Sequence, residues 1–298
     1  MRAATGWRHR VRRLPVAPYL FIAPNLLLFS TFTFLPLLFA VYISFNEWGL
    51  LGQPHFIAAG NYARIVEDRL FWRALGNTVV YSLGTVPTSL ALGLALALAL
   101  DRPLPGRSLI RSTFFLPVVI SGVATAVIAA WLFNDNYGVI NAVLQRIGLP
   151  KVNWLSSPSW ALPSLVITTL WVRLGFCMVV YLAALQSIPS DYYHAAAIDG
   201  ASRWAQFRYI VWPLLSPATF LLLILNVIYS FQVFDLIYVM TGGGPGFATT
   251  MLVQYIYQSA FITSEMGYAS AIGVVLYLLI LGFTVLQWRI SRQAQNAL

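Results

Sequence analysis

Residues 191–213, DYYHAAAIDGASRWAQFRYIVWP, form the one polar, helix-patterned stretch that separates two long apolar segments near several arginines. Ser190 supplies an N-cap for a first short helix, and Gly200 can end that helix in a left-handed conformation. Ser202 can cap a second helix, which we expect to end before Pro213 because a proline restricts the residue that precedes it. The stretch therefore predicts a helix, a turn and a second helix.

The motif inside this stretch is long and its spacing is unbroken. Its positions are His194, Ala195 and Ala196, then Gly200, and finally Ile210, Val211, Trp212 and Pro213. The pattern resembles the cytoplasmic signature loop of bacterial ABC importer permeases, in which Glu-Ala-Ala precedes a Gly, and Ile-x-Leu-Pro follows. Here His194 replaces the usual Glu, and Trp212 replaces the usual Leu.

The resemblance implies that residues 190–213 form coupling helices, which sit in a cleft of a separate ATPase. The residues that it places at this contact are His194, Ala195, Ala196, Asp199, Gly200 and Ala201. The histidine removes the acidic side chain through which an acid-to-arginine contact would form. The simpler alternative is an amphipathic loop helix that packs on the membrane surface.

The composition excludes an ordinary soluble domain. Of the 298 residues, 59% are hydrophobic and 9% are charged, whereas about a quarter of the residues of a soluble domain are charged. The net charge of +9 comes with 17 arginines among 18 basic residues, in short groups beside apolar segments. Such grouping is a signal of membrane topology, so we expect no nucleic-acid partner.

Six segments are long and apolar enough to span a bilayer, for which about 20 residues suffice. They comprise residues 19–45, 74–100, 113–133, 161–186, 212–240 and 266–288. Prolines inside them should kink these helices without breaking them. The first run carries no charge for 27 residues and is too long for a signal peptide. We therefore predict an all-α polytopic membrane protein with six transmembrane helices, like a type I ABC importer permease.

Basic residues in the connections indicate the orientation. Twelve lie on the side of the two termini and the signature loop, and five lie on the other side. We expect both termini to be cytoplasmic. The predicted organisation is a basic arm (1–17), a permease domain (18–290) with its coupling loop (190–213), and a tail (291–298). The resemblance places the chain in the bacterial inner membrane.

A glycine-rich turn follows the fifth segment as TGGGP, residues 241–245. It resembles the Thr-x-Gly-Gly-Pro turn of the permeases for carbohydrate and glycerol-phosphate uptake. That branch implies a second permease subunit, two ATPase subunits, an external substrate-binding protein and a small-molecule substrate. The chain itself has no GxxxxGK[ST] loop, so ATP hydrolysis is expected in the partners.

Polar residues inside the predicted spans are the candidates for a substrate path. They are Arg173, Asn226, Tyr229, Ser230 and Asp235. An arginine within a span should face the protein interior or a wet cavity, where it either contacts substrate or tethers another helix. Asn226, Tyr229 and Ser230 share one helical face, with Asp235 roughly opposite. Asp235 lies about five residues from the outer end of its span, whereas Arg173 is nearer mid-membrane, so we do not assume a pair between them. Hydrogen bonding between packed helices is the alternative role for the Asn226 face.

The sequence leaves three function classes to consider. An importer permease subunit for a sugar, glycerol phosphate or glycerophosphodiester agrees with the motifs. An ion-coupled secondary carrier would use the two ionisable residues in the spans, Arg173 and Asp235. A membrane-embedded enzyme would need a catalytic cluster, but His9, His55 and His194 lie far apart, and Cys177 is the only cysteine. We therefore expect no catalytic residues, no metal site and no cofactor.

Overall fold

The computed structural model describes residues 16–102 and 104–295. This part of the chain is almost entirely helical, and its only strands are the antiparallel pair β1 (Asn46–Glu47) and β2 (His55–Phe56). The all-α prediction is confirmed. Most of the predicted arm and the end of the predicted tail lie outside the described residues, and the last helix continues to Gln295.

The helices follow one another with short connections. The first half contains α1 (Val16–Phe29), η1 (Ser30–Phe34), α2 (Leu35–Ser44), α3 (Gly60–Glu67), α4 (Arg69–Leu100), α5 (Arg107–Val119), α6 (Gly122–Leu132) and α7 (Val139–Arg146). The second half contains α8 (Pro158–Gln186), α9 (Ser190–Ile198), α10 (Arg203–Gln206), η2 (Phe207–Val211), α11 (Trp212–Leu214), α12 (Ser216–Phe231), α13 (Asp235–Met240), α14 (Leu252–Tyr257), η3 (Gln258–Ile262) and α15 (Met266–Gln295).

Four of these helical stretches are long and apolar enough to cross a membrane, and there are six if each bent helix pair counts as one span. The bent pairs belong to the third and fifth predicted segments. α5 and α6 meet at 104°, and the helix from Arg203 to Leu214 meets α12 at 61°.

The prediction of kinks without breaks is wrong near Pro217, where the chain bends by 61° before α12, and it is wrong for the third segment. Ile120 is extended there, and Ser121 caps a new helix by accepting a hydrogen bond from the Ala124 N–H. A local N-cap satisfies a donor of the new helix, so the chain can start again in another direction. By contrast, Pro87 and Pro163 lie inside the unbroken helices α4 and α8.

Close helix crossings hold the centre of the molecule together. A Cβ atom on Gly93 of α4 would lie 2.5 Å from Cys177 Cβ in α8. A Cβ atom on Gly175 of α8 would lie 2.0 Å from the carbonyl oxygen of Phe114 in α5. Small residues at such crossings let helix backbones approach, which drives packing where lipid supplies no hydrophobic force between helices.

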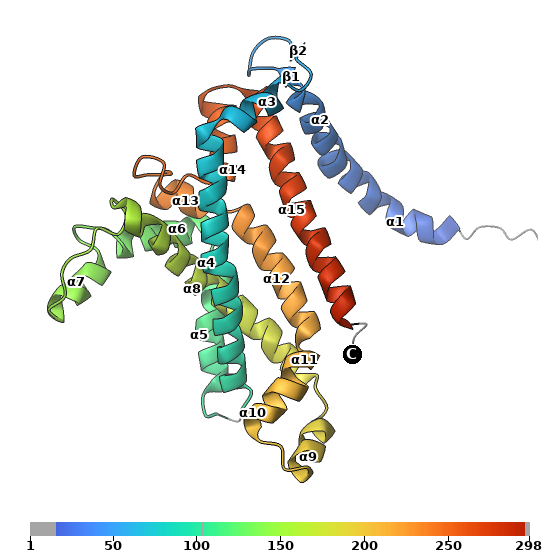
Figure 1. Cartoon of the computed structure of the whole chain (residues 1–298), viewed down its shortest axis with the longest axis vertical. Helices are drawn as coiled ribbons and strands as arrows, with labels where there is room; N and C mark the ends of the chain where they lie inside the picture. Colours follow the sequence, from blue (N-terminus) through green and yellow to red (C-terminus); the bar gives the residue numbers. More distant parts are fainter. Residues whose placement is uncertain (1–15, 103, 296–298) are drawn as a thin grey trace, which may run out of the picture.

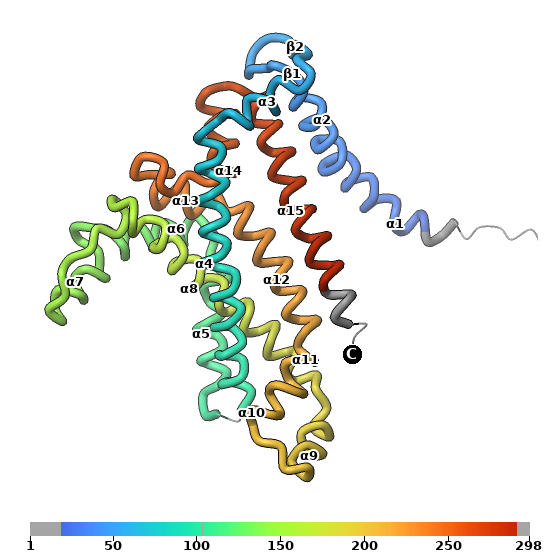
Figure 2. Tube along the Cα trace, viewed as in Figure 1, coloured from blue at the N-terminus to red at the C-terminus, as the bar shows by residue number. Residues whose placement is uncertain are grey.

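The molecule is elongated, with α3 and the strand pair at one end and α9 with α10 at the other (Figure 1). We call these the α3 end and the α9 end. α2 ends beside α15 at the α3 end, and α1, which precedes it, lies away from the rest of the bundle (Figure 2). Only 6% of an apolar 18-residue stretch within this first span, Tyr19–Ser44, is buried, so its apolar surface is open along most of its length.

A polar cluster ties three helices together at the α3 end. Asp68 caps α4 through the Leu70 N–H and also accepts hydrogen bonds from the hydroxyls of Tyr255 and Tyr268. Burial raises the pKa of the Asp68 carboxyl, but these hydrogen bonds outweigh burial and hold its pKa below the ordinary value. The carboxylate therefore links α4, α14 and α15.

Candidate functional site

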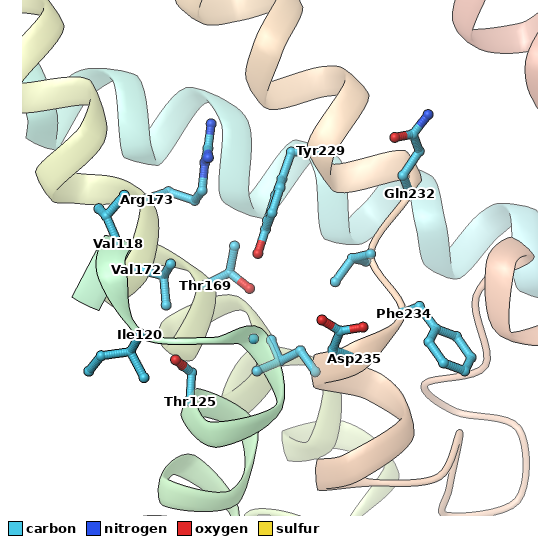
Figure 3. Close-up of a pocket in the computed structure, with 13 residues that line it drawn as sticks. Val118, Ile120, Thr125, Thr169, Val172, Arg173, Tyr229, Gln232, Phe234 and Asp235 are labelled. Atoms are coloured by element: carbon cyan, nitrogen blue, oxygen red, sulfur yellow. The ribbon is translucent and has the colours of Figure 1, made fainter. Parts of the chain in front are cut away.

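A cavity of about 360 Å³ opens where the two bent spans meet. It lies among the α5–α6 break, α8 and the connection from α12 to α13 (Figure 3). Its lining residues are Val118, Ile120, Gly122, Thr125, Thr169, Val172, Arg173, Tyr229, Gln232, Val233, Phe234, Asp235 and Leu236. Non-helical backbone at membrane depth is tolerated where it is buried in protein or lines a water-filled cavity. The α5–α6 break and the α12–α13 connection therefore mark a polar interior.

Arg173 reaches this cavity from α8 and is held from two sides. Its Nε donates to Asn226 Oδ1 at 2.9 Å. Its guanidinium lies 4.7 Å from the centroid of the Phe176 ring and 4.5 Å from that of Tyr229. Among the described residues the ion pair is Arg64 with Glu265, and no carboxylate pairs with Arg173. One guanidinium edge is thus a tether to α12, while the residue still lines the cavity.

Asn226 and Ser230 lie between helices rather than in the cavity wall. Asn226 is 3% exposed, and its amide donates to Cys177 Sγ of α8 at 3.4 Å and to the Leu222 carbonyl of its own helix. Ser230 is 1% exposed, and its hydroxyl donates to Ser82 of α4 at 2.8 Å. The structure places both residues in the interhelical role that the sequence left open as the alternative.

Tyr229 and Asp235 face the same cavity, contrary to the roughly opposite placement expected for one continuous helix. The reason is that α12 ends at Phe231 and α13 begins at Asp235, so helical spacing does not carry across the connection. Figure 3 shows the Asp235 carboxylate directed toward the space beside the Tyr229 hydroxyl. The structure thus brings together Arg173, Tyr229 and Asp235 from the predicted set.

The Asp235 carboxylate also lies against the first turn of α6. A Cβ atom on Gly122 would be 2.4 Å from Asp235 Oδ2, so glycine is needed for this approach. The N-terminal end of a helix carries partial positive charge, which favours a carboxylate there. One turn further, Thr125 is 2% exposed, and its hydroxyl has no hydrogen-bond partner among the described residues. Both features place polar groups at the α6 side of the cavity.

The second candidate site is the stretch at the α9 end. The Gly200 N–H donates to Ala197 O, and the Ala201 N–H donates to Ala196 O, which is a Schellman motif. Gly200 has the predicted left-handed conformation, with φ of 75°. The predicted cap at Ser202 is also confirmed, since its hydroxyl accepts from the Ala205 N–H at 3.2 Å.

Two boundaries of this stretch differ from prediction. Ser190 is the first residue of α9, whose N-cap is Pro189, and Ser190 makes no capping bond. The second helix does not end before Pro213, because α10, η2 and α11 run on to Leu214. A proline is tolerated there because it occupies the first turn of α11, where its missing N–H is not required.

α9 is largely open within this chain: none of its residues is buried, although Tyr193 packs against a hydrophobic cluster. Ile198 is 88% exposed and Trp204 is 70% exposed. His194, Ala195, Asp199 and Gly200 are exposed as well, while Ala196 and Ala201 are half-buried. Large apolar side chains in the open at one end of a molecule mark a surface for another protein or for the membrane.

A family model described as the binding-protein-dependent transport system inner membrane component matches residues 89–295. The chain belongs to this family. The sulfoquinovosyl glycerol transport system permease protein SmoG of Agrobacterium fabrum is 38% identical, covering 92% of this chain and 89% of its own. The trehalose/maltose transport system permease protein MalF of Thermococcus litoralis is 36% identical, covering 92% and 93%.

Solved structures show the same architecture. A bacterial alginate ABC transporter, crystallised in complex with an alginate pentasaccharide-bound periplasmic protein, contains a chain that is 25% identical to this permease. The match has a TM-score of 0.83 and covers 93% of this chain and 94% of that one. The predicted fold of an ABC importer permease is therefore confirmed.

Sequence reasoning missed several residues that line the cavity of this permease. Thr169 lies one turn before Arg173, and the Tyr81 hydroxyl is 2.5 Å from its own. Thr125 and Gly122 follow the break at Ile120. The signal that could have found the latter pair is the Ser-Gly dipeptide at residues 121–122, which is typical of a helix start inside an otherwise apolar run.

Proposed function

We propose that this permease subunit forms half of the translocation path of an ATP-driven importer for a sugar, a glycerol phosphate or a glycerophosphodiester. The observation that carries the proposal is the cavity between the two bent spans, lined by Arg173, Tyr229 and Asp235. Relatives named for sulfoquinovosyl glycerol and for trehalose and maltose support a substrate of this class.

The cavity wall offers the groups that such a solute needs. The terminal nitrogens of Arg173 can donate to a hydroxyl, a phosphate or another anionic group. Asp235 can accept from sugar hydroxyls. The Thr125 hydroxyl, which has no partner in the described part of the chain, can donate or accept. The Tyr229 ring supplies an apolar surface with a polar end. Neutral and charged hydrogen-bonding groups on an aromatic wall are typical of small-molecule sites.

The α9 end is the proposed contact with the ATPase. Its exposed first helix carries His194, Ala195, Ala196, Asp199 and Gly200, and Ala201 follows the turn. With both termini and this end in the cytoplasm, as the distribution of arginines favours, two ATPase subunits serve two permeases. The external binding protein then delivers the solute at the α3 end. A second permease subunit supplies the other half of the path.

An ion-coupled secondary carrier is the second candidate, because the Asp235 carboxylate faces the cavity without a basic partner among the described residues. In that mechanism Asp235 would bind and release the coupling ion. The two candidates predict different effects of Asp235→Asn. The variant abolishes ion-driven uptake, whereas ATP-driven uptake survives with altered affinity.

The deciding experiment is purification of the chain from its native membrane in mild detergent, with mass spectrometry of the co-purifying proteins. We expect a second six-helix permease and a protein with a GxxxxGK[ST] loop. The complex is then placed in vesicles with the binding protein outside and MgATP inside. Uptake that requires ATP and survives an ionophore supports the importer. A chain that purifies alone and transports without ATP overturns it.

A further inference from the structure

Four aromatic side chains form a continuous row beside the cavity, and the mechanism above does not use them. We call Phe234, Tyr238, Tyr257 and Phe261 the aromatic lane. The Phe234 and Tyr238 rings are stacked with centroids 5.2 Å apart, and the Tyr257 ring contacts both at 5.1 and 5.4 Å. Phe261 continues the row at 5.4 Å from Tyr257.

The lane leads from the cavity toward the α3 end. Phe234 lines the cavity itself, and Figure 3 shows its ring on the side away from Ile120. Tyr257 closes α14 and Phe261 lies in η3, and α14 lies nearer the α3 end than α13 does (Figure 1). The row therefore connects the proposed solute site with the end at which the solute is delivered.

The lane is a surface and not part of the core. Tyr238 is 47% exposed and Phe261 is 59% exposed. On the other face of α13, Leu236, Ile237 and Met240 are buried in a hydrophobic cluster. α13 is thus anchored by its aliphatic side chains, and its aromatic face is left open. The Tyr257 and Tyr238 side chains also hydrogen-bond to each other, but buried packing within this chain does not account for a row of adjoining rings on that open face.

We propose that the aromatic lane is a stacking surface along which pyranose rings pass between the α3 end and the cavity. The apolar C–H face of a sugar ring packs on aromatic faces, and the phenolic hydroxyls of Tyr238 and Tyr257 can exchange hydrogen bonds with sugar hydroxyls. The inference rests on the proposed function and narrows its substrate class to solutes with a ring. An open-chain polyol or glycerol phosphate has no flat face to stack.

The test measures uptake by the whole reconstituted complex with its binding protein. The probes are maltose, trehalose, glucuronate and methyl glucoside as pyranose solutes, and sorbitol and glycerol 3-phosphate as open-chain solutes. Tyr238→Ala removes a ring from the lane, and Tyr238→Phe keeps it. Phe247→Ala is the matched control, since Phe247 is also 47% exposed but lies outside the lane.

We expect the wild-type complex to import at least one pyranose probe. Tyr238→Ala should slow its initial uptake about 3- to 10-fold, which is the range of one aromatic contact. Phe247→Ala should stay within about twofold of wild type, and Tyr238→Phe, which keeps the ring and loses only the hydroxyl, should lie between wild type and Tyr238→Ala. Co-purification of the second permease should be unchanged in all three variants.

Other outcomes overturn the lane in distinguishable ways. Loss of the partner permease from Tyr238→Ala would identify the row as a subunit interface. Equal rates for Tyr238→Ala and Phe247→Ala would show that the rings do not touch the solute. Import of the open-chain probes alone would refute the lane and leave the glycerol-phosphate function standing. Failure of the wild type to import any probe with ATP would refute the proposed function, and the lane with it.

Discussion

Replacing Gly175 by alanine tests the packing that shapes the cavity. The added Cβ would lie 2.0 Å from the carbonyl oxygen of Phe114 and 2.9 Å from the Cα of Phe115. Both atoms belong to the backbone of α5, so no side-chain rotation relieves the overlap. Reaching ordinary contact at about 3.4 Å requires α5 to move away from α8 by about 1.4 Å.

This displacement has an energetic and a functional consequence. Overpacking in a close-packed interior costs about 1–3 kcal/mol, and a rigid backbone neighbour places this case near the upper end. α5 leads to Val118 and Ile120, while α8 carries Thr169 and Arg173. The two walls of the cavity would therefore separate, and we expect both thermal stability and ATP-driven uptake to fall.

The matched control is Gly282→Ala in α15, where an added Cβ meets nothing within 4 Å. Alanine there should be neutral or favourable by up to about 1 kcal/mol, because it is the better helix former. Thermal unfolding of the purified complex compares the two variants, and vesicle uptake is measured in parallel. A Gly175→Ala protein as stable and active as Gly282→Ala would show that α5 does not rest on the backbone of α8.

Three further predictions address the two sites and the α3 end. Gly200→Val should abolish uptake while membrane insertion stays intact, because φ of 75° costs a residue with a side chain about 1–2 kcal/mol. Gly200→Asn should retain most uptake, since asparagine tolerates this conformation. Normal uptake by the valine variant would count against the coupling turn. Arg173→Ala should change substrate affinity or selectivity more than assembly. Asn226→Ala removes the 2.9 Å tether and the amide bonds to Cys177 and Leu222 but leaves the guanidinium in place. Loss of the complex in both variants would make Arg173 purely structural. Asp68→Asn should lower the melting temperature at neutral pH. Because the folded pKa of Asp68 is lowered, its contribution to stability is present above the unfolded pKa of about 3.9 and is lost as the pH falls further. Wild-type and variant melting curves that stay equally far apart below about pH 4 would refute a role for its charge.

Local signals in the sequence were sufficient for the helices and for the turn at the α9 end. Long apolar runs predict spans because every backbone group in lipid must be paired within a helix. Gly200 and Ser202 have conformational roles that depend on a few neighbouring residues, so the Schellman turn and the cap followed from the pattern. These features needed no knowledge of tertiary contacts.

The cavity could not be derived in the same way, because its parts come together only in three dimensions. The predicted third and fifth spans run through Ile120 and Val233, so the apolar pattern does not show the break between α5 and α6 or the one between α12 and α13. Helical spacing then placed Asp235 opposite Tyr229, although the break turns both toward one space. Similarly, nothing local shows that Ser230 bonds to Ser82 of α4. Polar residues within a span can be found from sequence, but the groups that they face cannot.

The cavity and the α9 end are connected by two helical paths, of which one is continuous and the other is bent. From Arg173 in the cavity wall, α8 continues unbroken to Gln186, about 20 Å at 1.5 Å per residue, and α9 begins four residues later. From the α9 end, α10, η2 and α11 lead back to Leu214. The chain then bends by 61°, and α12 continues to Tyr229. A push on the α9 end by an ATPase would therefore move Arg173 directly through α8, while the bend near Leu215 absorbs part of the motion toward Tyr229. Such unequal transmission separates the two cavity walls instead of shifting them together, which is what a path that opens alternately to each side requires.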